Sequence, residues 1–553
     1  MSHIRISIAC ALPLLSSLAL AGDPVLQPKA GAPLLGLSDS QLDAFSAGAI
    51  SYQTPLTIAT GLGPVFNKGG CMSCHSNPLG GWGAIAVTRF GMDDKGTFID
   101  PPEFGGSLLQ AEAISSACRE VIPPEATVTA TRMTNSSMAF GMIEAIPDAS
   151  INANADPLDG NGDGISGTVH WVLPLEAIAG SPLRAGRFGW KAQVATVLTF
   201  SGDASLNEMG LTNRLVPTEN APNGDHVLLS QCDTIADPED FADASGKHFI
   251  DRVTDFQRYL GPPPQTPKTG MAGEVIFNAV GCANCHIASW TTANTKGLES
   301  ALRNKTIRPY SDFLLHDMGM LGDGVRQGDA SEQEIRTPTL WNLRSRDPML
   351  HNGLAAGGPF ADRVTVAINA HGPFGESAAS ALAFDSLSAG DKASLIAFLD
   401  SLGRAEFDFD GDGVRDLEDF TILRSYAGAA SNPNLATAIG DIDVNSVINS
   451  IDATYFVQAI ENFEDAARDC NGNGIADLVD IFAGTMPDTN GDGRGDNCPT
   501  LCVEDFNRDG IVDAADLAVL LNGWGGAGGD LNADGNTDAA DLAVLLNAWG
   551  NCA

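Results

Sequence analysis

Hydrophobic residues along this chain form a few clear helical patterns, separated by stretches rich in glycine and proline. The clearest lies just before Gly403, where apolar side chains recur at helical spacing: Leu395, Ile396, Leu399 and Leu402. Gly403 is expected to end this helix, because glycine readily adopts the left-handed conformation found at helix C-termini. An earlier helix is predicted in S-D-S-Q-L-D-A-F, where Ser38 or Asp39 can cap its first turn.

The first residues form another apolar stretch. A basic start at Arg5, an apolar run and small residues up to Ala21 predict a cleaved signal peptide over residues 1–21. A short membrane anchor is the weaker alternative, because Pro13 and Ser16 interrupt a run already shorter than the roughly 20 residues of a span. No later stretch is apolar for long enough to cross a bilayer. We therefore expect a periplasmic or secreted protein without a membrane span.

Acidic residues outnumber basic ones, 69 against 31, and give a net charge of −38. A protein of this charge repels nucleic acid, so we expect no nucleic-acid partner. The excess is concentrated in residues 404–553, which hold 28 acidic residues against six arginines. That segment therefore needs an explanation of its own.

Two C-x-x-C-H motifs indicate the main chemistry: Cys71, Cys74 and His75, and Cys282, Cys285 and His286. Covalent haem attachment requires two thiols one helical turn apart and an adjacent imidazole that ligates the iron. A redox C-x-x-C does not need the histidine, and a zinc site wants four ligands. Similar residues precede the motifs, V-F-N-K-G-G and I-F-N-A-V-G. The sequence thus predicts two covalently bound haem c groups in duplicated domains.

The remaining cysteines and prolines indicate the organisation around these motifs. Apart from Cys10 in the signal peptide, six further cysteines allow three disulfides in fifteen pairings: Cys118, Cys232, Cys470, Cys498, Cys502 and Cys552. Between the two haem motifs, the segment L-G-P-P-P-Q-T-P-K-T-G excludes a continuous helix. We place a domain boundary there, at about residue 265.

Several segments between residues 40 and 403 resemble the di-haem oxidoreductase family, whose members are described as peroxidase-like and are sometimes called thiol oxidoreductases. The resemblance rests on R-M-T-N-S-S-M-A-F-G-M-I-E-A-I-P-D, D-G-N-G-D-G-I-S-G, G-R-F-G-W-K-A-Q and P-Y-S-D-F-L-L-H-D-M-G. The segment R-T-P-T-L-W-N-L-R-S-R-D-P-M-L-H-N-G is also similar to bacterial di-haem cytochrome c peroxidases and their MauG-like relatives.

This resemblance implies that one haem receives electrons from a small redox donor and passes them to a second haem, where peroxide or a small oxidisable substrate reacts. Cleavage of the peroxide O–O bond also needs a nearby group that moves a proton. We name Glu144, in G-M-I-E-A-I-P, and Arg132 as candidate catalytic residues. The alternative is a structural carboxylate that caps a helix or pairs with Arg132.

The second axial ligands of the two irons are open at this point. The candidates are His316, Met318 and His351, with His371 and Met209 as further options, since any histidine or methionine can ligate iron. A lone histidine is more often a hydrogen-bonding residue than a ligand. Trp190 is a candidate for an inter-haem position that assists electron transfer, as a tryptophan does in the related peroxidases, and ordinary core packing is its alternative.

The acidic tail repeats a calcium-loop pattern, with oxygen ligands at positions 1, 3, 5, 7, 9 and 12 and glycine at position 6. The predicted calcium ligands lie in three loops: Asp408, Asp410, Asp412, Asp416 and Asp419; Asp505, Asn507, Asp509, Asp513 and Asp516; Asp530, Asn532, Asp534, Asp538 and Asp541. Further copies begin at Asp441, Asp469 and Asp488. A merely solvated acidic tail is the alternative, but it would not keep its aspartates in register with glycine and a following apolar helix.

The last two loops begin 25 residues apart and both continue into L-A-V-L-L-N. This pair resembles a type I dockerin, which implies a cohesin-like or cell-surface partner. We therefore expect a mainly α protein with this order: signal peptide 1–21, linker 22–37, cytochrome c-like haem domains 38–264 and 265–403, EF-hand-like calcium repeats 404–500 and a dockerin-like pair 501–553.

The leading hypothesis is an exported di-haem, peroxidase-like oxidoreductase that uses its calcium-binding tail for attachment or assembly. One alternative is a non-catalytic di-haem electron carrier, in which both irons would have six ligands. The other is a component of a cell-surface scaffold, for which the dockerin-like repeats are the only support.

Overall fold

The structure of the 553-residue chain is a computed structural model that describes residues 26–266, 271–429, 435–463, 465–498, 502–507 and 510–551. The protein is helix-rich, with 33% of its residues in helices, but 11% lie in strands that the sequence did not predict. The predicted signal peptide lies outside the described residues. Within the described ranges, every helix is too short or too polar to cross a bilayer.

The first helix, α1 (Asp39–Gln53), begins as predicted, with Ser38 as its N-cap. The Ser38 N–H donates to Gln41 Oε1 at 2.8 Å, which closes a capping box. The helix before the predicted stop at Gly403 is also confirmed as α10 (Ala389–Ser401). Its N-cap Ser388 accepts a hydrogen bond from the Asp391 N–H.

Helix α1 packs against α6 (Phe249–Tyr259). Phe45 and Tyr52 of α1 lie against Phe256, with ring centroids 5.2 and 4.7 Å apart. Gly48 allows this close approach, because a Cβ atom there would lie 2.3 Å from the Arg252 carbonyl oxygen. On another side of α6, the short helix α2 (Phe140–Glu144) uses Gly141 in the same way against Arg258.

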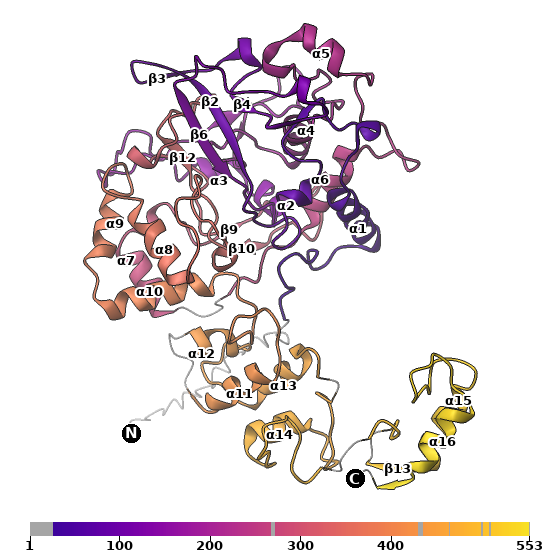
Figure 1. The fold of residues 1–553 in the computed structure, drawn as a ribbon. Coiled ribbons are helices and arrows are strands. Elements are labelled where there is room, and N and C mark those ends of the chain that lie inside the picture. The colour runs from indigo at the N-terminus through magenta and orange to yellow at the C-terminus, as the bar shows by residue number, and fades with distance from the viewer. Residues whose placement is uncertain are drawn as a thin grey trace, which may run out of the picture.

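An antiparallel sheet covers one side of the N-terminal region, where Figure 1 shows the long strands β2 and β6 side by side. Strand β2 is at its centre and pairs with three others: β2 (Ala86–Asp94), β3 (Thr97–Ile99), β4 (Leu108–Leu109) and β6 (Val128–Met133). Buried Phe90 and Phe98 anchor this sheet. Helix α4 (Val197–Met209) ends in Gly210, whose φ of 73° forms the left-handed C-cap.

The remaining elements are short. Two-stranded pairs are formed by β1 (Val65–Phe66) with β5 (Glu112–Ala113), β7 (Trp171–Val172) with β8 (Arg184–Ala185), β9 (Trp290–Thr291) with β10 (Thr306–Ile307), and β11 (Leu315–Asp317) with β12 (Glu334–Arg336). The other helices up to residue 403 are α3 (Asp148–Asn152), α5 (His226–Cys232), α7 (Ala272–Ala279), α8 (Phe360–Asn369) and α9 (Ala378–Asp385).

Two hydrophobic cores hold this part of the molecule together. One contains Phe140, Phe188 and Val197 together with Trp290, Phe313 and Trp341, so its residues come from both sides of the proline-rich break. The other is built from α7, α8, α9 and α10. Helix α6 ends at Tyr259 and the next helix, α7, begins at Ala272, so helical structure is interrupted here as the prolines predicted. The chain boundary near residue 265 is therefore crossed by a shared core.

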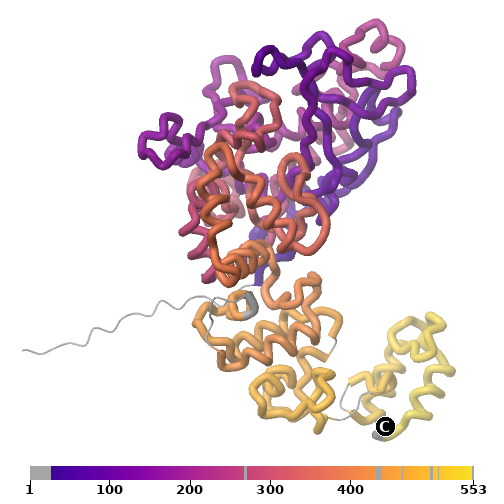
Figure 2. Tube along the Cα trace, turned by 60° about the vertical axis from the view of Figure 1, so that its left-hand side comes forward, coloured from indigo at the N-terminus to yellow at the C-terminus, as the bar shows by residue number. Residues whose placement is uncertain are grey.

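The acidic tail forms a separate lobe below α10, seen in orange and yellow in Figures 1 and 2. Its elements are α11 (Leu417–Ser425), α12 (Leu435–Gly440), α13 (Ser450–Ala459), α14 (Asp477–Ala483), β13 (Ile511–Val512), α15 (Ala514–Asn522), α16 (Ala539–Asn547) and β14 (Gly550–Asn551). Helices α11, α13 and α14 share one apolar core, whereas Ala438 of α12 packs with the core of α7 to α10. The last pair has a small core around Leu520 and Leu545.

Within the described residues, two disulfides are present among the six cysteines that the sequence analysis considered. Cys118 is bonded to Cys232, and Cys470 to Cys498. Cys552 lies outside the described residues. The four cysteines of the C-x-x-C-H motifs form no disulfide.

The helix contact at Gly48 gives a testable prediction. Gly48→Ala should lower the free energy of unfolding by about 1–3 kcal/mol, because the added methyl group is forced against the α6 backbone. Gly390→Ala is the matched control: Gly390 lies in α10, where a Cβ atom meets nothing closer than 3.8 Å. The control should be neutral or stabilising by about 0.5–1 kcal/mol. Denaturant unfolding of both variants tests this, and equal effects would contradict it.

Candidate functional site

Both C-x-x-C-H motifs form the same local structure. Cys71–Ser73 and Cys282–Asn284 are single 3-10 turns, in which side chains three positions apart lie on one side. The N–H of His75 donates to the Cys71 carbonyl, and that of His286 to the Cys282 carbonyl, both at 2.9 Å. Each turn therefore presents two thiols and an imidazole to one cavity.

Each imidazole is oriented by a backbone carbonyl. His75 Nδ1 lies 3.2 Å from the Gly81 oxygen, and His286 Nδ1 lies 2.9 Å from the Tyr310 oxygen. A proton donated from Nδ1 leaves Nε2 as the ligand atom. Burial lowers the pKa of both histidines to about 4, so they are neutral at pH 7. A neutral imidazole held in this way fits an axial iron ligand.

The thiols do not have the properties of a redox pair. Burial raises the pKa of Cys71 to about 12, of Cys74 to about 11 and of Cys282 to about 12. Redox C-x-x-C pairs depend on a lowered thiol pKa. The half-buried thiols, which form no disulfide and lie beside a neutral imidazole, therefore favour haem attachment over thiol exchange.

The first motif opens into a cavity of about 190 Å³. One wall is the length of α4, from Phe200 to Met209, and the facing wall carries Arg89 and Arg132. The candidate Met209 is buried in this wall. Apart from His75, no histidine of the described residues lines this cavity.

Two carboxylates that the sequence analysis missed lie in the α4 wall, Asp203 and Glu208. Burial raises the pKa of both. Glu208 Oε2 accepts a hydrogen bond from Asn67 Nδ2 at 2.8 Å. Across the cavity, Arg89 keeps its Nε buried without a hydrogen-bond partner. No motif marks these residues; only the fold places α4 along the haem motif.

The second motif opens into a cavity of about 160 Å³ with a different lining. All the candidate axial ligands from the second half of the chain line it: His316, Met318, His351 and His371. The sequence analysis named these residues as separate candidates, and the fold brings all four to this one cavity. Their individual environments, however, differ.

His316 is engaged at both ring nitrogens. Its Nε2 lies 2.9 Å from Asp312 Oδ2, and its Nδ1 lies 2.6 Å from Glu376 Oε2. Burial alone would lower the pKa of His316, but the hydrogen bonds to Asp312 and Glu376 outweigh it and raise the pKa well above the usual value. This arrangement describes a buried imidazolium with no nitrogen left for iron.

His351 has the opposite environment. Its side chain is 3% exposed, and its Nε2 is buried without a hydrogen-bond partner. Burial lowers its pKa to about 4, so the ring is neutral. An unpartnered neutral nitrogen in the wall of the cavity fits a second axial ligand. His371, whose Nδ1 lies 2.7 Å from the Ala367 oxygen, is the next candidate.

Trp190 lines both cavities and therefore lies in the wall between them. Its indole Nε1–H donates to the Met133 carbonyl at 2.8 Å, and its ring lies edge-on to His351, with centroids 5.9 Å apart. The guanidinium of Arg346 lies 3.9 Å from the ring centre of Trp82 and 5.1 Å from that of Trp190. Both interpretations of Trp190 are compatible with this position: a residue between the two sites that assists electron transfer, and an ordinary residue of a packed core.

The candidate pair Glu144 and Arg132 is not brought together. Glu144 Oε1 pairs with Arg258 at 2.9 Å, and its Oε2 accepts the Val197 N–H at the start of α4 at 2.6 Å. Arg132 pairs instead with Asp323 at 2.6 Å. Arg132 lines the first cavity, whereas Glu144 lines neither cavity. The contacts favour the structural alternative for Glu144, a carboxylate that caps a helix.

The acidic loops form compact turns with a recurring hydrogen bond. The first aspartate accepts the N–H of the sixth residue, as in Gly474 to Asp469 at 2.7 Å and Gly535 to Asp530 at 2.7 Å. In two loops, carboxylate oxygens gather within 4.8 Å of one another: Asp408, Asp410 and Asp419, and Asp441, Asp443 and Asp452. Asp509 lies outside the described residues.

The last aspartate of each loop has a second task. Asp419, Asp516 and Asp541 are fully buried and accept the N–H of the residue that caps the following helix. Burial raises the pKa of Asp419 to about 6. The helices α15 and α16, which follow the last two loops, have the same sequence A-A-D-L-A-V-L-L-N.

Two cavities that each combine two free thiols with a neutral imidazole define the class of a two-centre redox protein. The chain belongs to the family described as "Di-haem oxidoreductase, putative peroxidase", whose model matches residues 112–402. The family implies two haem cofactors. The matched range includes the second C-x-x-C-H motif and begins after the first.

The solved structures that resemble this chain include two of low sequence similarity. A hydrazine synthase from Kuenenia stuttgartiensis, pressurised with xenon, is 12% identical with a TM-score of 0.30, and the match covers 72% of this chain and 100% of that one. A MauG-like protein associated with microbial copper homeostasis is 14% identical with a TM-score of 0.30, over 68% and 94%. No curated protein matches the chain.

The contrast between His351 and His316 gives a second prediction. His351→Gln should convert one haem from a low-spin to a high-spin absorption spectrum, because it removes the unpartnered nitrogen of the second cavity. His316→Gln should leave the spin state unchanged. Absorption and electron paramagnetic resonance spectra of the ferric protein measure both. A spin change in His316→Gln and none in His351→Gln would contradict the assignment.

His316→Gln should instead act on stability. Removing one partner of a buried ion cluster costs about 3–5 kcal/mol. The pKa of His316 is raised in the folded protein. The decrease in the free energy of unfolding should therefore have its full size below about pH 6.5 and become smaller as the pH rises through that raised pKa. His226→Gln, at an exposed position on α5, is the control and should show no such pH dependence.

Proposed function

We propose that the chain is an exported di-haem c-type oxidoreductase that reduces peroxide at its first cavity. The family membership supports the reaction class. The observation that carries the proposal is the difference between the cavities. The first contains carboxylates and arginines but no second histidine, whereas the second contains a neutral histidine without a hydrogen-bond partner.

The residues present fit covalent haem at both motifs. Cys71, Cys74 and His75 would hold one group, and the equivalent residues after Gly281 would hold the other. When bound, haem supplies one-electron redox chemistry and a coordination position for peroxide. His351 is the proposed second axial ligand of the second haem, which would make this haem the centre that receives electrons.

The side chains of the first cavity supply the proton chemistry. Reduction of peroxide to two water molecules consumes two protons, so the site needs groups that hold a proton at neutral pH. Burial raises the pKa of Glu208 and of Asp203 in that direction. Arg89 stays cationic, with a pKa that burial lowers only to about 10, and its unpartnered Nε can orient an oxygen atom.

Trp190 and its neighbours have a positioning role between the cavities. The Trp190 ring contacts His351 on one side and is fixed by the Met133 carbonyl on the other. A buried aromatic ring in the shared wall shortens the path for an electron between the two sites. The donor would be a small redox protein or molecule.

The acidic tail is proposed to bind calcium and to serve attachment or assembly. Support comes from the repeated Asp and Gly loop pattern, the gathered carboxylates and the identical terminal helices. Dockerin-like pairing with a cohesin-like partner is the proposed use of the last two loops. Export is proposed from the N-terminal sequence and agrees with disulfides in both lobes.

The peroxidase proposal predicts that Glu208→Gln lowers kcat for peroxide reduction about 100-fold or more, because the variant cannot transfer a proton. Haem content, measured as the pyridine haemochrome, should be unchanged. The measurement is steady-state peroxide turnover with a reduced small-molecule donor.

Glu144→Gln is the matched control, because Glu144 lies outside both cavities. It should keep kcat within a few-fold of the parent protein and lose stability through its contact with Arg258. If Glu144→Gln abolished turnover while Glu208→Gln did not, the sequence-based candidate would be right and the first-cavity assignment wrong. Absence of any peroxide turnover by the parent protein would favour the electron carrier.

For the tail, we expect removal of calcium with a chelator to reduce the helical circular dichroism signal of the full chain. The unfilled loops bring together carboxylates that repel one another. Asp516→Asn combined with Asp541→Asn should reduce the calcium-dependent part of the signal. An unchanged spectrum on chelation would show that the tail is only a solvated acidic segment.

A further inference from the structure

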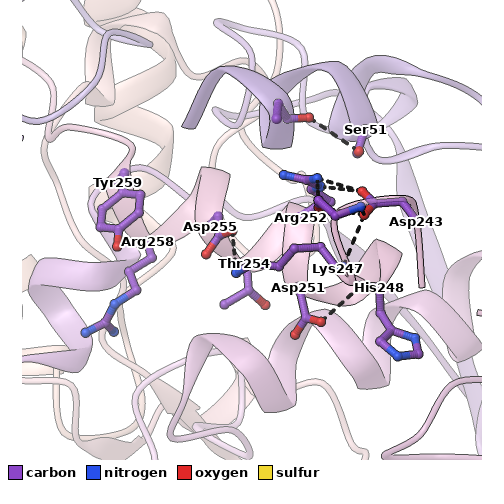
Figure 3. A network of polar contacts seen from close by, with 12 residues as sticks. Ser51, Asp243, Lys247, His248, Asp251, Arg252, Thr254, Asp255, Arg258 and Tyr259 are labelled. Carbon is purple, nitrogen blue, oxygen red and sulfur yellow. Dashed lines mark hydrogen bonds and ion pairs between the residues drawn. The ribbon is translucent and has the colours of Figure 1, made fainter. Parts of the chain in front are cut away.

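The chain between α4 and α6 makes a long excursion, from residue 210 to residue 248, with little regular structure. It contains only the turn Pro222–Gly224 and helix α5 among its described elements. The disulfide of Cys232 with Cys118 ties its middle to the N-terminal region. Its end is fixed to α6, where Figure 3 shows Asp243 facing Arg252, with an ion pair of 2.6 Å.

Three carboxylates meet inside this excursion: Glu219, Asp237 and Glu239. Each offers an oxygen atom, and the three atoms lie within 4.8 Å of one another. Glu219 is 5% exposed and Glu239 is 8% exposed, whereas Asp237 is at the surface. Nothing in the sequence marks this group, since its members lie outside the acidic tail and follow no loop pattern.

Two oxygen atoms of the group are buried and unpartnered. Glu219 Oε2 and Glu239 Oε2 accept no hydrogen bond from any described residue. Glu219 Oε1 accepts only its neighbour, the Asn220 N–H, at 3.0 Å. Among the described residues, none of the three carboxylates forms an ion pair with a lysine, arginine or histidine. Burial, followed by repulsion from neighbouring carboxylates, raises the pKa of Glu219 to about 9 and of Glu239 to about 7.

We propose that Glu219, Asp237 and Glu239 bind a calcium ion that fastens this excursion to the first haem region. Buried carboxylate oxygens without partners are costly unless a cation or proton compensates them. The donor set contains only oxygen, which excludes the softer nitrogen and sulfur sites of zinc or copper. Calcium takes several carboxylates together with water, and exposed Asp237 leaves room for water ligands, whereas magnesium usually takes one or two carboxylates.

The site is linked to the first cavity by a short stretch of chain. Thr212 Oγ1 donates to Asp237 Oδ1 at 2.8 Å and accepts the Glu239 N–H at 3.0 Å. Thr212 follows closely on Met209, which together with Glu208 lines the cavity. Gly61, whose φ is 93°, lets Glu239 approach closely, since a Cβ atom there would lie only 3.1 Å from the Glu239 Cβ. The ion would therefore hold the end of α4 in place.

The direct test is the anomalous difference map of a crystal of the full-length protein grown in millimolar calcium chloride, collected at long wavelength. We expect a peak bounded by the three carboxylates. If the map shows no peak there, the proposal is overturned, whether the other sites in the same crystal are filled with calcium or empty.

Thermal unfolding in solution gives a second test, followed by the haem Soret absorbance so that the first lobe is observed. Calcium should raise the melting temperature of this transition by about 5 °C in the parent protein. Glu219→Gln with Glu239→Gln should abolish this rise, and the milder Asp237→Asn, at a surface position, should weaken it.

Two controls separate this site from others. Glu125→Gln, at an exposed position, should keep the full calcium shift. Asp516→Asn with Asp541→Asn, in the tail, should also keep it, so failure of the tail proposal leaves this one standing. If the double glutamine variant is more stable than the parent protein and both respond equally to calcium, the carboxylates share protons instead and the proposal is wrong.

Discussion

The peptide unit of Met133 is the point on which both cavities depend. Its carbonyl accepts the Trp190 indole N–H at 2.8 Å, and its N–H donates to the His351 carbonyl at 2.6 Å. Met133 is also the last residue of β6, so the sheet of the N-terminal region ends at this junction. Met133 thus fixes both the Trp190 ring, which lies in the wall shared by the cavities, and the backbone of His351, the candidate axial ligand. A shift of this strand would change both sites together.

Buried charge surrounds the same junction and makes its position specific. Arg132 and Lys191 both pair with Asp323, at 2.6 and 3.1 Å, and all three side chains are at most 5% exposed. Burial lowers the pKa of Lys191 to about 8. Buried ion pairs add little net stability, but removing one partner is costly, so such a cluster tolerates few alternative packings. The cluster joins residues 132 and 191 to residue 323 and therefore fixes the position of the two haem regions relative to each other.

The sequence predicted the local structure well, because that structure depends on short spacings. The C-x-x-C-H turns, the cap at Ser38 and the stop at Gly403, whose φ is 92°, all follow from neighbouring residues. What it could not predict depends on contacts between distant segments. Glu208 lies in the first cavity only because α4 crosses the first motif, and Glu144 leaves the site only because Arg258 and Val197 bind it.

The same reasoning explains why identical residue types have different roles in the two cavities. Histidine is neutral where burial dominates, as at His351, and cationic where two carboxylates bind it, as at His316. Burial raises the pKa of aspartate and glutamate where it dominates, as along α4, and these residues cap helices where backbone N–H groups reach them, as in the acidic tail. The residue type therefore limits which roles a side chain can have, and its surroundings in the fold determine which of these roles it takes. The two cavities therefore differ in their chemistry although both are built on the same C-x-x-C-H turn, because the side chains on their other walls differ.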